Sequence, residues 1–366
     1  IRMNGFKTLW RGLRSPLLGL VLAMIICTLL LMAFGEHPRV LLEALRNTFC
    51  THFGIGYTLF YVTPLIFTGL SVAMSFHCGL FNIGAEGQLY VGAIAIIAFA
   101  AVFPHLPALL AIPLAAFSAA LAGGIWGAIA GVLKAKRGTH EVIVTILLNF
   151  LAVYFVDYLL LYHFKNFEVQ NTETITISDA YLLQPLSNFS QRLGLEWFYT
   201  TPVNTSLFLA IFMAFIVYFF LFHTTYGYEL RATGHNPDAA RFSAISISRS
   251  TILAFMLSGA LAGLVGVNEI MGYQQKLLQG FSPEYGFTGI AVALMARNHP
   301  LGILLSAFLF GAIHNCSREL EFASEKVTRE LSMVLEAILI AFVASRALFE
   351  KWAEQYKARK RGQSHV

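Results

Sequence analysis

Charged residues are scarce in this chain: they make up 12% of its 366 residues, whereas hydrophobic residues make up 57%. A soluble domain usually carries about a quarter charged residues. The low charge therefore indicates that most of the protein surface faces lipid. The net charge of +5 gives no reason to expect a nucleic acid as partner.

Catalytic and metal-binding motifs are also missing. The sequence contains no G-x-x-x-x-G-K-[ST] phosphate loop, no H-E-x-x-H, no G-x-S-x-G and no cluster of cysteine and histidine. The chain cannot use ATP by itself, and we expect neither an enzyme nor a bound cofactor or metal. Its four cysteines lack paired spacing, so we expect four unpaired thiols. One alternative is a bridge between Cys50 and Cys316 outside the membrane.

Long apolar runs are present instead. A helix needs about 20 apolar residues to cross a bilayer. The first run follows a basic stretch, as in a signal peptide, but it is long for a cleavable core and we predict a transmembrane helix. Ten stretches are candidate spans, of which the third and eighth are the weakest: 16–34, 55–75, 87–103, 106–133, 142–162, 203–222, 251–272, 285–296, 299–316 and 331–348.

The distribution of basic residues predicts the orientation of these spans. Lysine and arginine gather in cytoplasmic segments of membrane proteins, and ten alternating spans place residues 1–15, 134–141 and 223–250 and the basic C-terminal tail on that side. We therefore predict an all-α membrane protein in which residues 1–366 form one transmembrane domain with cytoplasmic N- and C-termini. The loop 163–202 is then extracytoplasmic and the loop 223–250 cytoplasmic.

Ten spans divide into two sets of five. Because five is an odd number, a second set that arose by duplication would cross the membrane in the opposite direction from the first. Two glycine-punctuated segments favour this plan, residues 79–88 and 280–289, each of which precedes an apolar run. We predict two inverted halves on this basis.

The segment Phe81-Asn-Ile-Gly-Ala-Glu-Gly-Gln88 is unusually polar for its surroundings. Asn82, Glu86 and Gln88 are costly in hydrocarbon unless they face a cavity or a partner. The glycines allow the backbone to break, and a broken helix is tolerated at membrane depth where it lines a water-filled path. The alternative is a short cytoplasmic turn with ordinary polar residues.

Other polar and small residues lie within the predicted spans. Asn149 and Asn268 either face the same path or form hydrogen bonds between helices. Two stripes of glycine predict close helix packing without implying a function: Gly123, Gly127 and Gly131, and Gly259, Gly263 and Gly266.

The loop 223–250 contains the signal for a short helix at residues 237–244. Asn236 suits the N-cap, Pro237 the first helical position, and Asp238 the positive end of the helix dipole. The helix is either a solvated connector or a docking element for a cytoplasmic partner.

Four motifs in this order resemble permeases of bacterial ABC importers for nucleosides. They are the segment 81–88, Arg231-Ala-Thr-Gly-His-Asn-Pro-Asp-Ala-Ala-Arg241, Ser258-Gly-Ala-Leu-Ala-Gly263, and residues 280–294 followed by His299-Pro-Leu-Gly302. The wider group includes permeases for simple sugars and branched-chain amino acids. The resemblance implies an inner-membrane permease that works by alternating access with a cytoplasmic ATPase, a second identical or paralogous permease and an extracytoplasmic solute-binding protein. ATP and Mg²⁺ would bind to the ATPase.

The resemblance also implies that the short helix is the coupling helix, which docks into the ATPase. Its predicted contact residues are Asn236, Pro237, Asp238, Ala239, Ala240 and Arg241. Such permeases usually carry Glu-Ala-Ala and a following glycine, whereas this chain has Asp238 in place of the acid and Ala244 near the glycine.

A nucleoside requires amides and carboxylates for its hydroxyls and aromatic faces for its ring. The predicted substrate path is Phe81, Asn82, Glu86, Gln88, Asn149, Asn268, Phe281 and Tyr285. Another sugar-like solute or an amino acid remains an alternative substrate. The alternative function is an ion-coupled secondary transporter, for which we would expect more acidic or histidine residues deep in the spans.

Overall fold

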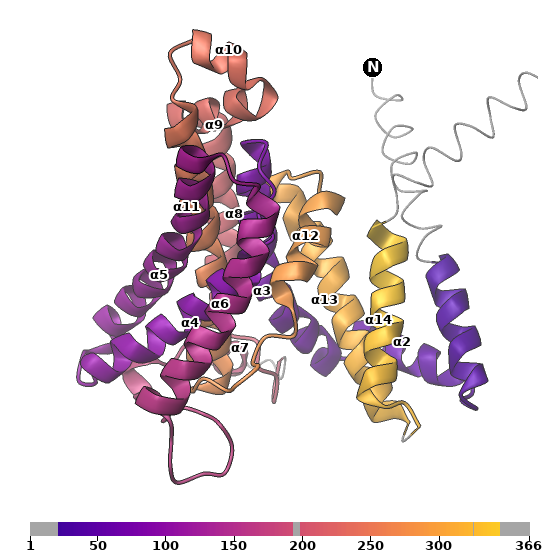
Figure 1. Cartoon of the computed structure of the whole chain (residues 1–366). Helices are drawn as coiled ribbons and strands as arrows, with labels where there is room; N and C mark the ends of the chain where they lie inside the picture. The colour runs from indigo at the N-terminus through magenta and orange to yellow at the C-terminus, as the bar shows by residue number, and fades with distance from the viewer. Residues whose placement is uncertain (1–20, 193–197, 325, 345–366) are drawn as a thin grey trace, which may run out of the picture. The chain divides into compact units, whose positions relative to one another are not determined.

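The computed structural model describes residues 21–192, 198–324 and 326–344, and over these ranges it is helical, with isolated β-bridges in place of strands (Figure 1). Helices are expected for apolar runs, because a backbone in lipid has to satisfy its hydrogen bonds within itself. Both predicted cytoplasmic termini lie outside the described residues.

The chain divides into two compact units, Ile1–Gly54 with Ala312–Val366, and Ile55–Gly311. The first unit holds the helix Val21–Ala33, α2 (Arg39–Cys50), the start of α3 (His52–His77), the end of α13 (Pro300–Ala323) and α14 (Arg329–Ala344). Its helices are joined by polar contacts: His314 Nδ1 lies 2.7 Å from Glu336 Oε1, and Ser317 donates to the carbonyl of Ser332 over 2.9 Å. All four cysteines are free, as the sequence predicts.

The second unit holds the rest of α3 and the remaining helices. They are α4 (Ala85–Val102), α5 (Ala108–Arg137), α6 (Glu141–Leu159) with its π-helical extension η1 (Leu160–Phe164), η2 (Asp179–Tyr181), α7 (Leu186–Arg192), α8 (Ser206–His223), α9 (Thr225–His235), α10 (Pro237–Phe242), α11 (Ile247–Gly263) with the π-helix η3 (Val267–Gln274), α12 (Tyr285–Met295) and the first part of α13.

Seven helices in the described part are long and apolar enough to cross a membrane, and they coincide with seven predicted spans. The predicted eighth span is the 11-residue helix α12. At about 1.5 Å per residue it is shorter than the hydrocarbon core, which is about 30 Å thick. The predicted first and last spans are described only in part, as Val21–Ala33 and α14. The count of ten therefore stays a prediction.

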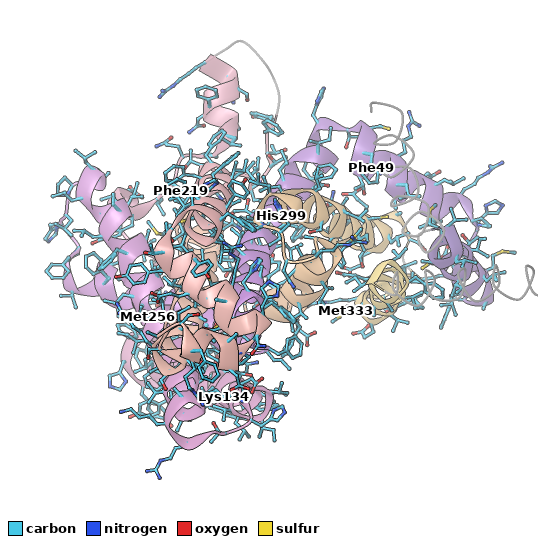
Figure 2. The ribbon with its side chains drawn as sticks, turned by 90° about the horizontal axis from the view of Figure 1, so that it is seen from above. Phe49, Lys134, Phe219, Met256, His299 and Met333 are labelled. Atoms are coloured by element: carbon cyan, nitrogen blue, oxygen red, sulfur yellow. The ribbon has the colours of Figure 1, made fainter. Side chains whose placement is uncertain are left out.

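The spans of the second unit differ in burial. Most residues of α3, α4 and the continuous α11–η3 are buried, whereas about a third or fewer of those in α5, α6 and α8 are. A row of phenylalanines on α8 is exposed, namely Phe208, Phe212, Phe215 and Phe219, the last labelled in Figure 2. An exposed apolar row on a spanning helix is the surface that lipid or another membrane subunit covers.

The two predicted glycine stripes pack directly against each other and join α5 to α11. A Cβ added to Gly123 would lie 2.4 Å from the carbonyl oxygen of Gly259, and one added to Gly127 would lie 2.4 Å from that of Phe255. Helix α4 approaches α11 in the same way, since a Cβ on Gly92 of α4 would lie 2.4 Å from the Cα of Gly263. These three helices can approach so closely only because the contact positions carry no side chain.

The described part of loop 163–202 folds onto neighbouring segments rather than standing free. Glu173 and Leu278 form an isolated bridge, and Lys276 Nζ lies 2.7 Å from Glu173 Oε1. Tyr181, which is fully buried, donates to the carbonyl of Phe103 over 2.6 Å.

Candidate functional site

The polar segment 81–88 contains a true break between helices. Helix α3 ends at His77 and α4 begins at Ala85, and Gly79 between them has a φ of +72°. Positive φ is readily reached only by glycine. Its amides are buried, because Asn82 has no exposed surface and Gln88 at the start of α4 is 2% exposed, whereas Gly79 is exposed. A solvated turn would expose these amides. That the break lies at membrane depth and lines a water-filled path stays a prediction.

Asn82 is the centre of a hydrogen-bond network that holds the break. Its Nδ2 donates to Gln88 Oε1 over 3.0 Å and to Ser258 Oγ on α11 over 2.7 Å, and its Oδ1 accepts from the backbone N–H of Gly84 over 2.8 Å. Ser258 in turn donates to the carbonyl of Ser71 on α3 over 2.6 Å. One amide therefore connects α3, α4 and α11. A buried network of this kind rigidifies a site when its members are satisfied.

Asn149 holds the same break from α6. Its Oδ1 accepts from the backbone N–H of Gly87 over 2.8 Å, and its Nδ2 donates to the carbonyl of Ile83 over 2.9 Å. These are backbone groups that a continuous helix would have satisfied internally. Asn149 therefore makes contacts from α6 to the backbone of residues 83 and 87, which is one of the two roles the sequence left open. Its place on a solute path stays a prediction.

Glu86 joins the first glycine-punctuated segment to the second. Its Oε2 accepts from the backbone N–H of Gly286, in the first turn of α12, over 2.7 Å. A carboxylate is favourable there because the N-terminus of a helix carries partial positive charge. Nearby, the rings of Tyr90 and Phe281 have centroids 4.8 Å apart. The segments that the sequence proposed as counterparts in two halves are thus in contact.

The other predicted path residues divide between this junction and a second network. Tyr285 is buried in the first turn of α12, and Phe81 packs on Phe76 with centroids 5.1 Å apart. Asn268 belongs elsewhere: its Oδ1 accepts from Asn204 over 3.2 Å and from Ser206 over 2.9 Å. Its Nδ2 donates to Glu269 Oε1 over 3.1 Å.

Sequence reasoning missed the hydroxyl partners of these networks. Ser71, Ser258 and Ser206 are ordinary residues in apolar helices. Ser258 and Ser206 gain a role only through a distant amide, and Ser71 only through Ser258. The nearest signal was the position of Ser258 at the start of the Ser-Gly-Ala-Leu-Ala-Gly motif. The junction as a whole offers a buried carboxylate, amides and two aromatic rings at a break in the membrane helices, which is the chemistry that a sugar-like solute requires.

The loop 223–250 folds as two short helices, α9 and α10. Asn236 is the N-cap of α10, as predicted, and its Oδ1 accepts from the backbone N–H groups of Asp238 over 3.0 Å and Ala239 over 3.1 Å. The helix ends at Phe242, two residues earlier than predicted, because Ala244 adopts a φ of +59° and turns the chain. Ala244 therefore takes the left-handed conformation that glycine favours.

The predicted docking residues differ in exposure. Asn236, Pro237, Asp238, Ala239 and Arg241 are exposed, whereas Ala240 is 3% exposed. Phe242, which sequence reasoning missed, is 94% exposed. The feature of the sequence that could have identified Phe242 is that it is a single aromatic residue in a short polar helix. Figure 1 shows α10 beyond α9, at the tip of the second unit.

Comparison with known proteins gives a consistent result. The profile of the family described as branched-chain amino acid transport system / permease component matches residues 54–344. The nucleoside ABC transporter permease protein NupB of Lactococcus lactis subsp. cremoris is 34% identical over 96% of this chain and 95% of its own length. The guanosine ABC transporter permease protein NupP of Bacillus subtilis is 34% identical over 90% of this chain and 92% of its own.

A third relative, the glucose ABC transporter permease protein TsgB13 of Haloferax volcanii, is 31% identical over 94% of this chain and 90% of its own length. No solved structure matches the chain significantly.

Proposed function

This chain belongs to the family of permease components of branched-chain amino acid transport systems, and from that premise we propose that it is the membrane-spanning subunit of an ATP-binding-cassette importer for nucleosides. It is a multi-pass membrane protein and not an enzyme, since permease components leave ATP hydrolysis to a separate subunit. We place it in the bacterial inner membrane.

The observation that carries the proposal is similarity over nearly the whole chain to permeases named for nucleosides and guanosine. A relative named for glucose is also similar over 94% of the chain. Both kinds of solute share a sugar ring with several hydroxyl groups. We therefore expect a nucleoside as solute, with a simple sugar as the closest competitor.

For the architecture, we propose ten spans in two inverted halves with cytoplasmic termini, the loop 163–202 outside and the loop 223–250 inside. The two glycine segments support this plan. Each contains a glycine with positive φ, Gly79 at +72° and Gly280 at +67°, and each leads into a helix, α4 or α12. The two segments are in contact through Glu86 and Gly286. In transporters built from two inverted halves, the solute site lies where the halves meet, near the middle of the membrane.

We place the solute path at this junction. In the described conformation Glu86, Phe281 and Tyr285 are buried against protein, so the path is closed. Opening it requires the bond between Glu86 and the N-terminus of α12 to break, which frees a carboxylate and an aromatic face for a solute. Asn82, Gln88 and Asn149 keep the shape of the break, and Asn268 fixes the opposite end of α11–η3.

For the coupling, we propose that the exposed residues of the segment Asn236–Arg241, together with Phe242, dock on a cytoplasmic ATPase that binds ATP and Mg²⁺. The exposed face of α10 supports this assignment, since a side chain that is 94% exposed contributes nothing to the fold that holds it. ATP can shift the permease between two states only if α10 contacts the ATPase differently in each. The remaining partners are a second permease, identical or paralogous, and an extracytoplasmic solute-binding protein, with no role for nucleic acid.

The test is affinity purification of the chain from its native membrane in mild detergent, followed by identification of what copurifies and by ATPase assays. The proposal is supported if an ATPase copurifies with the chain and if adding nucleoside together with the solute-binding protein raises its ATPase activity. If glucose but not nucleoside stimulated the ATPase activity, the assignment of a nucleoside as the solute would be overturned. If the chain purified without an ATPase, the proposal that it is a subunit of an ATP-driven importer would be overturned.

A further inference from the structure

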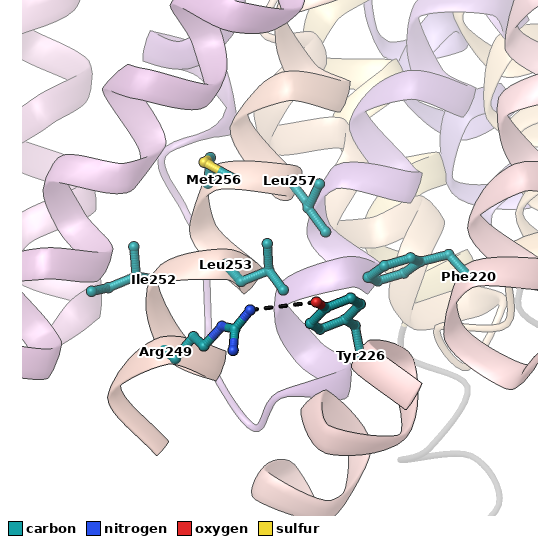
Figure 3. Close-up of a pocket in the computed structure, with 7 residues that line it drawn as sticks. All are labelled: Phe220, Tyr226, Arg249, Ile252, Leu253, Met256 and Leu257. Carbon is teal, nitrogen blue, oxygen red and sulfur yellow. Dashed lines mark hydrogen bonds between the residues drawn. The ribbon is translucent and has the colours of Figure 1, made fainter. Parts of the chain in front are cut away.

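A cavity of about 580 Å³ lies between α8, α9 and α11, and none of its lining residues belongs to the proposed solute path or to α10 (Figure 3). Ligand sites in proteins typically measure about 300–1,000 Å³. Its walls are almost entirely apolar. The lining residues are Phe220, Tyr226, Arg249, Ile252, Leu253, Met256 and Leu257.

One face of α11 forms the longest wall of this cavity. Residues 249, 252, 253, 256 and 257 follow the spacing of a single helical face, with Arg249 in the first turn. Leu257 lies about 12 Å further along the helix axis, at about 1.5 Å per residue. The cavity is therefore charged at one end and apolar along its depth.

The charged end lies at the boundary between span and loop. Arg249 donates to the hydroxyl of Tyr226 over 3.5 Å, and its guanidinium lies 5.3 Å from the centroid of that ring, as Figure 3 shows. Within the described ranges no carboxylate lies within ion-pairing distance of Arg249. A guanidinium has five N–H donors, so most of its hydrogen-bonding capacity is left for a ligand.

We propose that this cavity binds an anionic phospholipid, with the phosphate on Arg249 and Tyr226 and an acyl chain along Leu253, Met256 and Leu257. Arginine binds phosphate through two parallel hydrogen bonds. Tyrosine and arginine at the end of a span hold headgroups, and apolar residues deeper in the span face acyl chains. The cytoplasmic leaflet, where the proposed topology places Arg249, is rich in anionic lipid.

Other occupants fit the cavity less well. A polar solute would leave the apolar walls unused. A second copy of the chain would enclose Arg249 in a dry interface, where a charge without a counterion is costly. An anionic lipid satisfies both ends of the cavity at once.

The experiment is native mass spectrometry of the full chain, purified with the subunits that accompany it and equilibrated with equal amounts of phosphatidylglycerol and phosphatidylcholine. We expect the wild type to retain phosphatidylglycerol in preference. R249Q should weaken that retention at least about fivefold, the effect of one basic residue near an anionic surface. Leu253→Trp, which narrows the cavity, should reduce retention of both lipids. R137Q is the matched control, because Arg137 is exposed at the end of α5 on the same predicted side and lines no part of the cavity.

Equal retention by R249Q and the wild type would overturn the proposal. So would equal losses in R249Q and R137Q, because they would show only a general surface charge effect. A photoreactive benzophenone amino acid in place of Leu257 identifies the occupant directly. A crosslink of phospholipid mass supports the proposal, and a crosslink of twice the chain mass would assign the cavity to a second copy.

Discussion

Replacing Phe242 with alanine isolates the contact between α10 and the proposed ATPase. Phe242 is the most exposed large apolar side chain of the described residues, at 94%. It is the last residue of α10 and lies beyond the N-cap that holds the helix. The substitution therefore leaves the fold of the loop intact.

The size of the effect follows from the surface involved. Moving a phenylalanine side chain from water into a fully buried site contributes about 1.5–3 kcal/mol. If docking buries Phe242, then Phe242→Ala should weaken binding of the ATPase by about 2 kcal/mol, or roughly 30-fold. The free energy of unfolding of the permease should change by less than about 0.5 kcal/mol, as is usual for exposed positions.

The assay is a titration of the detergent-solubilised permease with the purified ATPase subunit, read as a dissociation constant. Phe212→Ala is the matched control, since Phe212 is also exposed, at 58%, but lies within the spanning helix α8. We expect Phe212→Ala to bind like the wild type. If F242A binds within about twofold of the wild type while its thermal stability is unchanged, α10 does not dock through this side chain and the reasoning fails.

Three further substitutions test the packing and the networks. Gly123→Ala should destabilise the protein by about 1–3 kcal/mol, the usual effect of overpacking, because its Cβ would lie 2.4 Å from the carbonyl oxygen of Gly259. Gly302→Ala is the comparison: its Cβ would meet its nearest atom at 3.3 Å, so its melting temperature should fall less, and an equal fall would contradict the reasoning. Asn82→Ala should lower both the melting temperature and solute uptake, because it leaves buried hydrogen-bond partners unsatisfied at a cost of about 1–3 kcal/mol each. A wild-type melting temperature in this variant would contradict the role of the network. Ala244→Gly should raise stability by up to about 1 kcal/mol, because it relieves a left-handed alanine, and a fall in melting temperature would contradict this.

Local signals in the sequence predicted much of the fold. Apolar runs of sufficient length became the seven spanning helices, and Asn236, Pro237 and Asp238 marked the start of α10. These features depend on neighbours along the chain. The helix α2, by contrast, was not predicted, because its 12 residues mix arginine and glutamate with leucine and do not form an apolar run.

The site could be predicted only in part, because its contacts join distant segments. Asn82 was identified as unusual, but its bond to Ser258 spans 176 positions and no local pattern indicates it. Asn149 was assigned two alternative roles, and the choice depends on the backbone of residues 83 and 87. Ala240 was predicted as a docking residue by resemblance, and no local pattern indicates that it is only 3% exposed.

The most direct test of the account is uptake of radiolabelled nucleoside into proteoliposomes that contain the chain, its copurified subunits and the solute-binding protein. The liposomes are prepared either with ATP and Mg²⁺ on the ATPase side or with an ion gradient and no nucleotide. The account predicts uptake that requires ATP, is lost when the ATPase is omitted, and is unaffected by collapse of the gradient. Uptake by the chain alone, driven by the ion gradient, would contradict it and would identify a secondary transporter.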